Sequence, residues 1–299
     1  MPEGHGRFLR ERVQWRRWHR WTRLAAALPQ QWSAPHPGAA SYGRPQDSRQ
    51  ERHQGRLEGC MRTPTTDEPE QRDQNRLLSR LPAEVRGRLL DDVDPVRPAF
   101  RQAIYEPDRP LPYVYFPVDA VFSILTVLEE GGAVEVATVG NEGMLGLPVF
   151  LHAEASPGHA FCQIVGEALR MRAGRFRAHI EREPALRDVL LRYTAAFLAL
   201  LAQSAACSRA HAVEARLARW LLMTHDRVGR DEFPLTQEFM GQMLGVGRAT
   251  VNTAAGMLQR AGFVHYVRGR VTVADRAGLE SAACECYGVI GREFDRLLG

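Results

Sequence analysis

The sequence contains no lysine, and all 39 of its basic residues are arginines. Arginine suits bidentate contacts with phosphate and guanine, although codon usage alone can produce such a bias. Residues 1–60 carry 11 arginines against 5 acidic residues, whereas residues 61–299 carry 28 against 30. Most of the chain is therefore not basic, and any nucleic-acid surface must be local.

Long apolar runs and an ordered cysteine pattern are also missing. No stretch approaches the roughly 18 apolar residues of a membrane span, so we expect a cytoplasmic protein with no membrane partner. The five cysteines are scattered, at Cys60, Cys162, Cys207, Cys284 and Cys286. Without a signal peptide, an odd set indicates a reducing compartment rather than a disulfide framework. Cys284 and Cys286 would face different directions on a helix, so no metal site is predicted.

Residues 1–75 differ in composition from the rest of the chain. They are rich in Arg, Trp, Gln, Pro and Gly and show no sustained apolar period. This composition predicts a disordered basic leader. Two other interpretations stay open: translation begins at Met61, or the leader is a functional arm that touches DNA or a membrane.

Short apolar segments within residues 76–183 predict a sensor domain built mainly of strands. Leu77–Leu90 has helical spacing, and Pro82 is placed to start a second helix. The predicted strands, punctuated by glycine and proline turns, are Tyr113–Pro117, Ala120–Leu128, Val134–Val139, Ala160–Val165 and Ala168–Met171. Closely spaced strands of this kind are typical of a jelly roll or a small β-barrel.

A long helix is predicted over residues 184–208, opened by Pro184. Its apolar stripe is wide enough to pack on the β domain and also to form the seam of a dimer. The residues assigned to the dimer interface are Leu190, Tyr193, Phe197, Leu200 and Leu201.

The most specific pattern lies within residues 209–299, where 234–262 read PLTQEFMGQMLGVGRATVNTAAGMLQRAG. Thr236 is predicted to cap a first helix, Gly245 to end it, and a second helix to begin near Gly247 or Arg248. The outward face of that second helix is made mostly of small residues, which lets a helix approach the floor of a major groove. Two helices joined by a tight glycine turn are typical of a helix-turn-helix.

The chain continues as FVHYVRGRVTVAD, which predicts a β-hairpin with its tip at Arg268-Gly269-Arg270. Such a hairpin is a wing whose arginines would contact phosphates. The stretch Phe239–Ala274 contains four arginines and no acidic residue. This local charge favours DNA over a protein as the partner of the winged helix.

These motifs resemble the Crp/Fnr family of bacterial transcription regulators. The resemblance covers about 220 residues, from near Arg80 onward, and is carried by FPVDAVFSIL, VGNEGMLG, HAVEARLARWLL, LTQEFMGQMLGVGRATV, LQRAGFV and VRGRVTVADRAGLE. It implies an α+β fold: an N-terminal jelly-roll-like β-roll of the cyclic-nucleotide-binding type, a long dimerisation helix and a C-terminal winged helix-turn-helix. It also implies a homodimer on an inverted-repeat operator in double-stranded DNA, an effector acting through the β-roll, and RNA polymerase as a partner if the protein is an activator.

The resemblance and the helix face together assign DNA-binding residues. Arg248 is expected to contact a guanine and Asn252 an adenine, although Arg248 could contact phosphate without reading a base. The other assigned residues are Thr236, Gln237, Ala249, Thr250, Thr253, Arg268 and Arg270. Ala249 and Thr253 replace a glutamate and an arginine that are common in the family, so a different operator is expected.

A second departure concerns the effector. The family's nucleotide-binding members hold the cyclic phosphate with an arginine late in the β-roll, near a glycine–glutamate pair. Here no arginine lies between Arg109 and Arg170. Cyclic AMP is therefore disfavoured and no cofactor is predicted, because burying a phosphate without a charged donor is costly. Asn141, Glu142 and Gly143 are weak effector candidates, with no cation expected opposite the acid.

An enzyme is not expected, because a nucleophile elbow, a phosphate loop and paired carboxylates are missing from the sequence. The alternative from another class is a cupin-like ligand- or metal-binding protein whose winged helix docks to protein. Its weakness is the segment HAEASPGH, which lacks a usual metal-ligand spacing.

Overall fold

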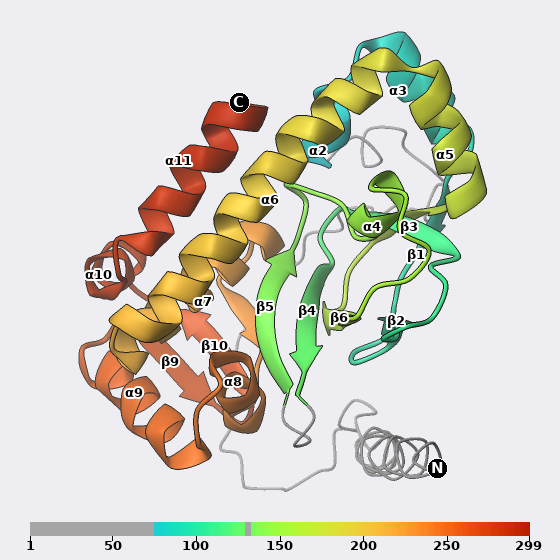
Figure 1. The fold of residues 1–299 in the computed structure, drawn as a ribbon. Helices are drawn as coiled ribbons and strands as arrows, with labels where there is room; N and C mark the ends of the chain where they lie inside the picture. The colour runs from blue at the N-terminus through green and yellow to red at the C-terminus, as the bar shows by residue number, and fades with distance from the viewer. Residues whose placement is uncertain (1–74, 129–132) are drawn as a thin grey trace, which may run out of the picture. The chain divides into compact units, whose positions relative to one another are not determined.

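The computed structural model describes residues 75–128 and 133–299 (Figure 1). The predicted leader lies outside the described residues except for Asn75, so its three interpretations stay predictions. Asn75 itself is buried, and its side-chain amide donates to the Pro117 and Gly143 carbonyl oxygens at 2.8 and 2.9 Å. Its Oδ1 also accepts from the backbone N–H of Leu78, which caps the first described helix.

That first helix, α2 (Arg76–Ser79), is followed by α3 (Ala83–Leu90). Pro82 stands at the N-cap of α3, which confirms the predicted start of a second helix. Leu77, Leu78 and Leu89 are almost completely buried, so both helices close one end of the core under the strands.

The strands form two antiparallel sheets, as the sequence pattern predicts. The strands are β1 (Asp94–Val96), β2 (Ala103–Tyr105), β3 (Tyr113–Pro117), β4 (Val121–Val127), β5 (Ala133–Val139), β6 (His159–Ile164) and β7 (Ala168–Arg172). One sheet has the order β1-β7-β3 and the other β2-β6-β4-β5. All five predicted strands are confirmed, while β1 and β2 are three-residue strands that periodicity does not reveal.

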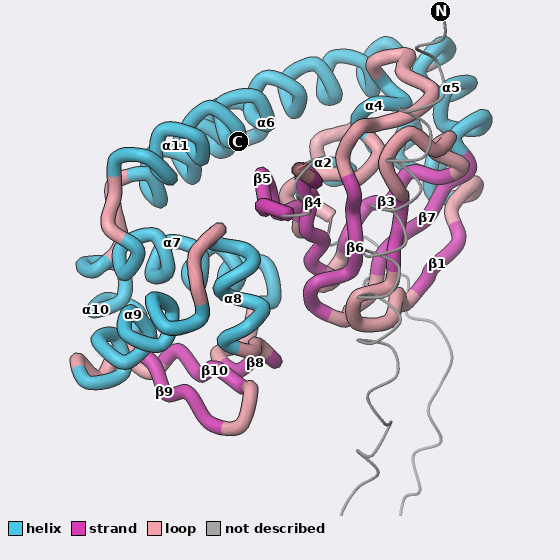
Figure 2. The backbone as a smooth tube through the Cα atoms, turned by 60° about the horizontal axis from the view of Figure 1, so that its bottom comes forward, coloured by secondary structure: helices cyan, strands magenta, loops and turns pink. Residues whose placement is uncertain are grey.

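A set of helices surrounds the sheets. A short α4 (Leu147–Phe150) follows Gly146, whose φ of +103° favours glycine. Next come α5 (Ala173–Arg182), the long α6 (Pro184–Ala210) and, at the C-terminal end of the chain, α11 (Cys286–Leu298). Figures 1 and 2 both show α11 lying alongside α6. The Phe294 and Tyr193 rings meet there edge to face, with centroids 6.5 Å apart.

Helix α6 confirms the predicted long helix. Among the described residues it is also the one helix long and apolar enough to cross a membrane by length and composition, with 28% of its most apolar window buried. Part of its stripe packs in the chain's own core, and another part, with Leu191 and Leu198, is more than half exposed.

The remaining elements form a winged helix. They are α7 (Val213–Val228), β8 (Glu232–Pro234), α8 (Gln237–Leu244), α9 (Arg248–Arg260), β9 (Val264–Val267), β10 (Arg270–Val273) and α10 (Arg276–Ala282). The sheet order is β8-β10-β9, so the predicted hairpin gains a third strand from before the first helix.

Aromatic contacts pack α8 against the outer face of the four-stranded sheet. The Phe239 ring lies 5.9 Å from the Phe161 ring and 6.5 Å from Trp220 on α7. The Arg101 guanidinium stands over the Phe239 ring at 5.7 Å. Residues from β4 and β6 thus share one apolar core with the winged helix.

Candidate nucleic-acid interface

Local hydrogen bonds fix the turn between α8 and α9. The Thr236 Oγ1 accepts from the backbone N–H of Phe239 at 3.2 Å, which confirms the predicted cap. Gly245 ends α8 with φ +65°, as predicted, in a conformation that favours glycine. The Val246 N–H then bonds back to the Gly241 carbonyl oxygen at 2.9 Å, so the chain turns tightly before α9 begins at Arg248.

Helix α9 presents the predicted outward face. Its inward residues, Val251, Ala254, Ala255 and Leu258, are buried. The outward residues Arg248, Ala249, Thr250, Asn252 and Thr253 are all exposed. Within the described residues, the Arg248 side chain forms no ion pair or hydrogen bond. It stands at the first position of the helix, where free backbone N–H groups and the helix dipole favour an anion.

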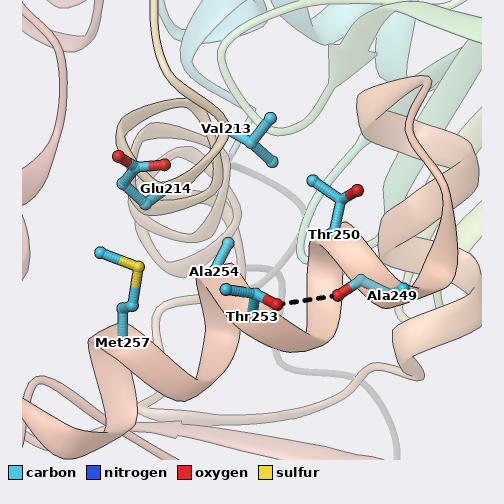
Figure 3. Close-up of a pocket in the computed structure, with 7 residues that line it drawn as sticks. All are labelled: Val213, Glu214, Ala249, Thr250, Thr253, Ala254 and Met257. Atoms are coloured by element: carbon cyan, nitrogen blue, oxygen red, sulfur yellow. Dashed lines mark hydrogen bonds between the residues drawn. The ribbon is translucent and has the colours of Figure 1, made fainter.

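Three of these residues line a shallow hollow of about 360 Å³ together with the start of α7 (Figure 3). Ala249, Thr250 and Thr253 face it from α9, and Glu214 from α7. The Thr253 Oγ1 donates to the Ala249 carbonyl oxygen at 3.1 Å. The hydroxyl proton of Thr253 is therefore taken up by a hydrogen bond within α9. Its methyl group and oxygen lone pairs remain available for contact with a bound ligand.

The two wing arginines differ in their surroundings. Arg268 is exposed, has no ion pair among the described residues, and has a φ of +47°. Arg270 is paired with Glu232, which lies on β8 beside it in the sheet. The stretch Phe239–Ala274 has no acidic residue of its own, but in the folded chain an acidic side chain from the neighbouring strand β8 lies against it. Glu232 was missed because no periodicity reveals a three-residue strand.

The loop with Asn141, Glu142 and Gly143 meets a cation, contrary to the prediction. The Arg227 guanidinium, from α7, donates to the Glu142 Oε1 at 2.8 and 3.0 Å, and both side chains are nearly buried. A Cβ on Gly143 would lie 2.4 Å from the Tyr193 ring, so this glycine permits close packing on α6. The prediction failed because the partner lies 85 residues further along the chain. This loop joins the β-roll to α6 and α7.

Most of the residues assigned to the dimer interface pack in the core of their own chain. Leu190, Tyr193 and Leu200 are buried in the core that α11 covers, and the Tyr193 hydroxyl donates to the Met144 carbonyl oxygen at 3.0 Å. Phe197 and Leu201 are partly buried. Burial leaves little of the first three side chains for a partner.

Known proteins share both the helix-turn-helix domain and the fold of this chain. Residues 215–282 match the Crp-like helix-turn-helix domain, and every assigned DNA-binding residue lies inside that range. Among solved structures, FixK2 from Bradyrhizobium japonicum aligns at 18% identity with a TM-score of 0.56, over 64% of this chain and 98% of its own. A regulator from Eubacterium rectale assigned to the Crp/Fnr family aligns at 14% identity with a TM-score of 0.54, over 69% and 96%.

Residues 215–282 are a Crp-like helix-turn-helix domain, and the chain has the fold of Crp/Fnr-type regulators. The c-di-GMP-responsive regulator CLP of Xanthomonas campestris has the same fold, at 14% identity and a TM-score of 0.53, over 64% of this chain and 99% of its own. No curated protein matches the sequence. The expected fold class is confirmed, and the Crp-like helix-turn-helix domain supports the expectation of a DNA-binding protein.

Proposed function

We propose that this chain is a transcription regulator of the Crp/Fnr type that binds an inverted-repeat operator as a cytoplasmic homodimer, and that an effector acting on the β-roll modulates the binding. The observation that carries the proposal is the outward face of α9. It combines small exposed side chains with Arg248 at the helix N-terminus, which has no ion pair among the described residues, on a helix fixed by the capped turn before it. A helix with this face fits closely into a major groove.

Base reading by Arg248 has a direct test. Sequences bound by the full chain are first selected from random DNA, and an inverted repeat is expected because a two-fold dimer presents two recognition helices about 34 Å apart. Arg248→Ala should then weaken binding to the selected site by about 1–3 kcal/mol and relax the preference at one base pair. Arg292→Ala, which removes an exposed arginine on α11, is the matched control.

The outcomes separate two roles for Arg248. Equal loss of affinity for all sequences would mean that Arg248 contacts phosphate without reading a base. If the purified chain bound no DNA even at low ionic strength, the proposed function itself would fail.

An exposed seam on α6 supports the homodimer. Its members are Leu191, Ala195, Leu198, Ala202 and Ala205, all exposed. They alternate in steps of four and three residues, the spacing that brings two helices together as a coiled coil. Leu191 and Leu198 are 54% and 60% exposed, a high exposure for leucine that a second copy of α6 would remove. We assign the dimer contact to this seam, with Phe197 and Leu201 of the earlier prediction at its margin.

The packing between the β-roll and the winged helix supports an effector response. Phe239 and Arg227 each join an element of the winged helix to the β-roll. A ligand that alters the β-roll could therefore change the placement of the DNA-binding helices. Cyclic AMP is not expected as this ligand, because Glu142 already has a buried partner and no arginine lies between Arg109 and Arg170. Calorimetric titration with cyclic AMP should show no binding.

A further inference from the structure

Four potential metal ligands converge where α6 ends and α11 begins. Cys207 lies in the last turns of α6, and His211 is the C-cap residue of that helix. Cys284 lies in the loop before α11, and Cys286 is the first residue of α11. One ligand atom from each of the four residues lies within 4.8 Å of all the others.

The distances within this cluster approach those of tetrahedral coordination. The Cys207 Sγ lies 3.5 Å from the Cys284 Sγ, and the Cys286 Sγ lies 3.5 Å from the His211 Nδ1. Zinc–sulfur bonds of about 2.3 Å and zinc–nitrogen bonds of about 2.0 Å place tetrahedral ligands roughly 3.5–3.8 Å apart. The side chains therefore need only small shifts to share one ion.

Neighbouring groups orient the ligands. The His211 Nε2 lies 3.1 Å from the Glu285 carboxylate, so the Nδ1 is left facing the three sulfurs. A carboxylate on the far nitrogen is the usual partner of a metal-binding histidine. The Gln203 Nε2 donates to the Cys286 Sγ at 3.0 Å, a contact that a thiolate accepts well.

Burial and charge also fit a cation. Cys207, Cys284 and Cys286 are buried. A bound metal ion deprotonates cysteine thiols and holds the thiolates, so a buried set of three sulfurs suits a divalent cation. Arg216 and Arg219 lie near Cys207 and offset the negative charge of such a site.

We propose that Cys207, His211, Cys284 and Cys286 bind one zinc ion in a closed structural site. Three sulfurs and one imidazole form a complete tetrahedral set with no open position for a substrate, which is the pattern of structural rather than catalytic zinc. The ligands lie on both sides of the Crp-like domain at 215–282, and none lies inside it. The ion ties α11 to the junction between α6 and α7.

The expectation of no metal site rested on the two-residue spacing of Cys284 and Cys286. That spacing separates side chains only when both are in a helix. Here the helix starts at the second cysteine, so the loop turns the first one toward the same point. The other two ligands are four residues apart, and the His211 N–H bonds back to the Cys207 carbonyl oxygen at 3.1 Å, so the C-cap histidine stays beside the last turns of α6.

The test measures metal in the full chain, purified without a histidine tag from cells supplied with zinc. Mass spectrometry of the metal content should give about one zinc per chain. Cys207→Ser, Cys284→Ser, Cys286→Ser and His211→Gln should each lower the occupancy at least tenfold. Cys162→Ala and His265→Gln, which alter a buried cysteine and an exposed histidine elsewhere, should retain it. Zinc that is absent from the wild type, or retained in all four ligand variants, would overturn the proposal.

Two further measurements do not depend on how the ligand variants fold. Cobalt(II) added to the metal-free wild-type chain should show the ligand-field bands of a tetrahedral ion and thiolate-to-cobalt charge transfer. Glu285→Gln should keep the fold and weaken zinc affinity about tenfold, since it removes the carboxylate behind His211. Octahedral cobalt spectra, an iron–sulfur absorption, or a Cys207–Cys284 disulfide in protein purified under reducing conditions would each contradict a zinc site.

Discussion

Arg268 occupies a backbone position that suits asparagine or glycine better than arginine. It and Gly269, with φ of +47° and +78°, form the two-residue turn between β9 and β10, where a type I′ turn requires positive φ at both residues. Holding a non-glycine residue in this region costs about 1 kcal/mol. A side chain kept at such a cost, exposed at the tip of a wing, is consistent with a contact to DNA.

Arg268→Asn should therefore separate stability from binding. The free energy of unfolding should rise by about 0.5–1 kcal/mol, because asparagine tolerates positive φ. The slope of log affinity for the operator against log salt should become shallower by about one unit, because one phosphate contact is lost. Urea unfolding and salt-dependent binding measure the two effects. An unchanged salt slope would show that Arg268 does not contact DNA.

Glu135 on β5 is a second residue whose surroundings predict a measurable effect. Its Oε1 accepts from the Trp220 Nε1 at 2.7 Å, while its Oε2 is buried and has no hydrogen-bond partner among the described residues. Desolvation by burial raises its pKa from the ordinary value of 4.5 to about 7. Between these two values the folded chain binds more protons here than the unfolded chain, so the Glu135 contribution to stability falls as pH rises.

Glu135→Gln should remove that pH dependence. Relative to wild type, the variant should become more stable as pH rises from about 4.5 to 7, by up to roughly 3 kcal/mol in total. The comparison must be with wild type, because burial lowers the pKa of His159 to about 4 and its contribution changes in the opposite direction below pH 6.5. Urea unfolding at several pH values measures the difference. A constant difference across this range would mean that Glu135 is charged in the folded protein.

At the scale of elements, α6 has two apolar faces, of which one is buried and the other exposed. One packs under α11 and the β-roll in the same chain, through Leu190, Tyr193 and Leu200. The other is the exposed seam that begins at Leu191. This division explains why only 28% of the most apolar 18-residue stretch of α6 is buried, although the helix is so apolar.

A charge placed in the seam should disrupt the dimer without unfolding the chain. Leu198→Asp puts a carboxylate at an exposed position, so the monomer should keep its fold, while pairing of two such helices would bury two like charges. Light scattering should show a monomer, and affinity for the inverted repeat should fall. Leu128→Asp, at a leucine of similar exposure just after β4, is the control. A variant that stays dimeric would move the interface away from this seam.

At the scale of the whole molecule, the buried pair of Arg227 and Glu142 joins the winged helix to the β-roll. The guanidinium also donates to the Met223 carbonyl oxygen at 2.9 Å, and a Cβ on Gly140 would lie 2.5 Å from the Arg227 side chain. The glycine thus makes room for the arginine. A buried pair of this kind is costly to break from one side, since the remaining charge has no partner.

Glu142→Leu should lower the free energy of unfolding by about 3–5 kcal/mol. The double variant Glu142→Leu with Arg227→Met should recover most of this loss, because it removes both charges and fills the space with apolar atoms. Urea unfolding of the single and double variants gives the coupling. If the double variant were as unstable as the sum of both single variants, the pair would not act as a unit.

Local sequence determined the elements that have strong periodicity or turn chemistry. The five longer strands, the two helices around Gly245 and the Thr236 cap follow from side-chain spacing, glycine conformation and hydrogen bonds within four residues. These features depend on neighbours along the chain, so the exposed face of α9 was also predictable. The three-residue strands were not, because three residues carry too little pattern.

Only the tertiary structure decided which distant groups meet. The partner of Glu142 comes from α7, the partner of Arg270 from β8, and the four ligands of the proposed zinc site from two segments about 75 residues apart. It also decided which face of α6 stays exposed, because α11 covers the other face from the far end of the chain. Such contacts depend on how elements pack, and side-chain spacing along one segment carries no information about the segment that will lie opposite.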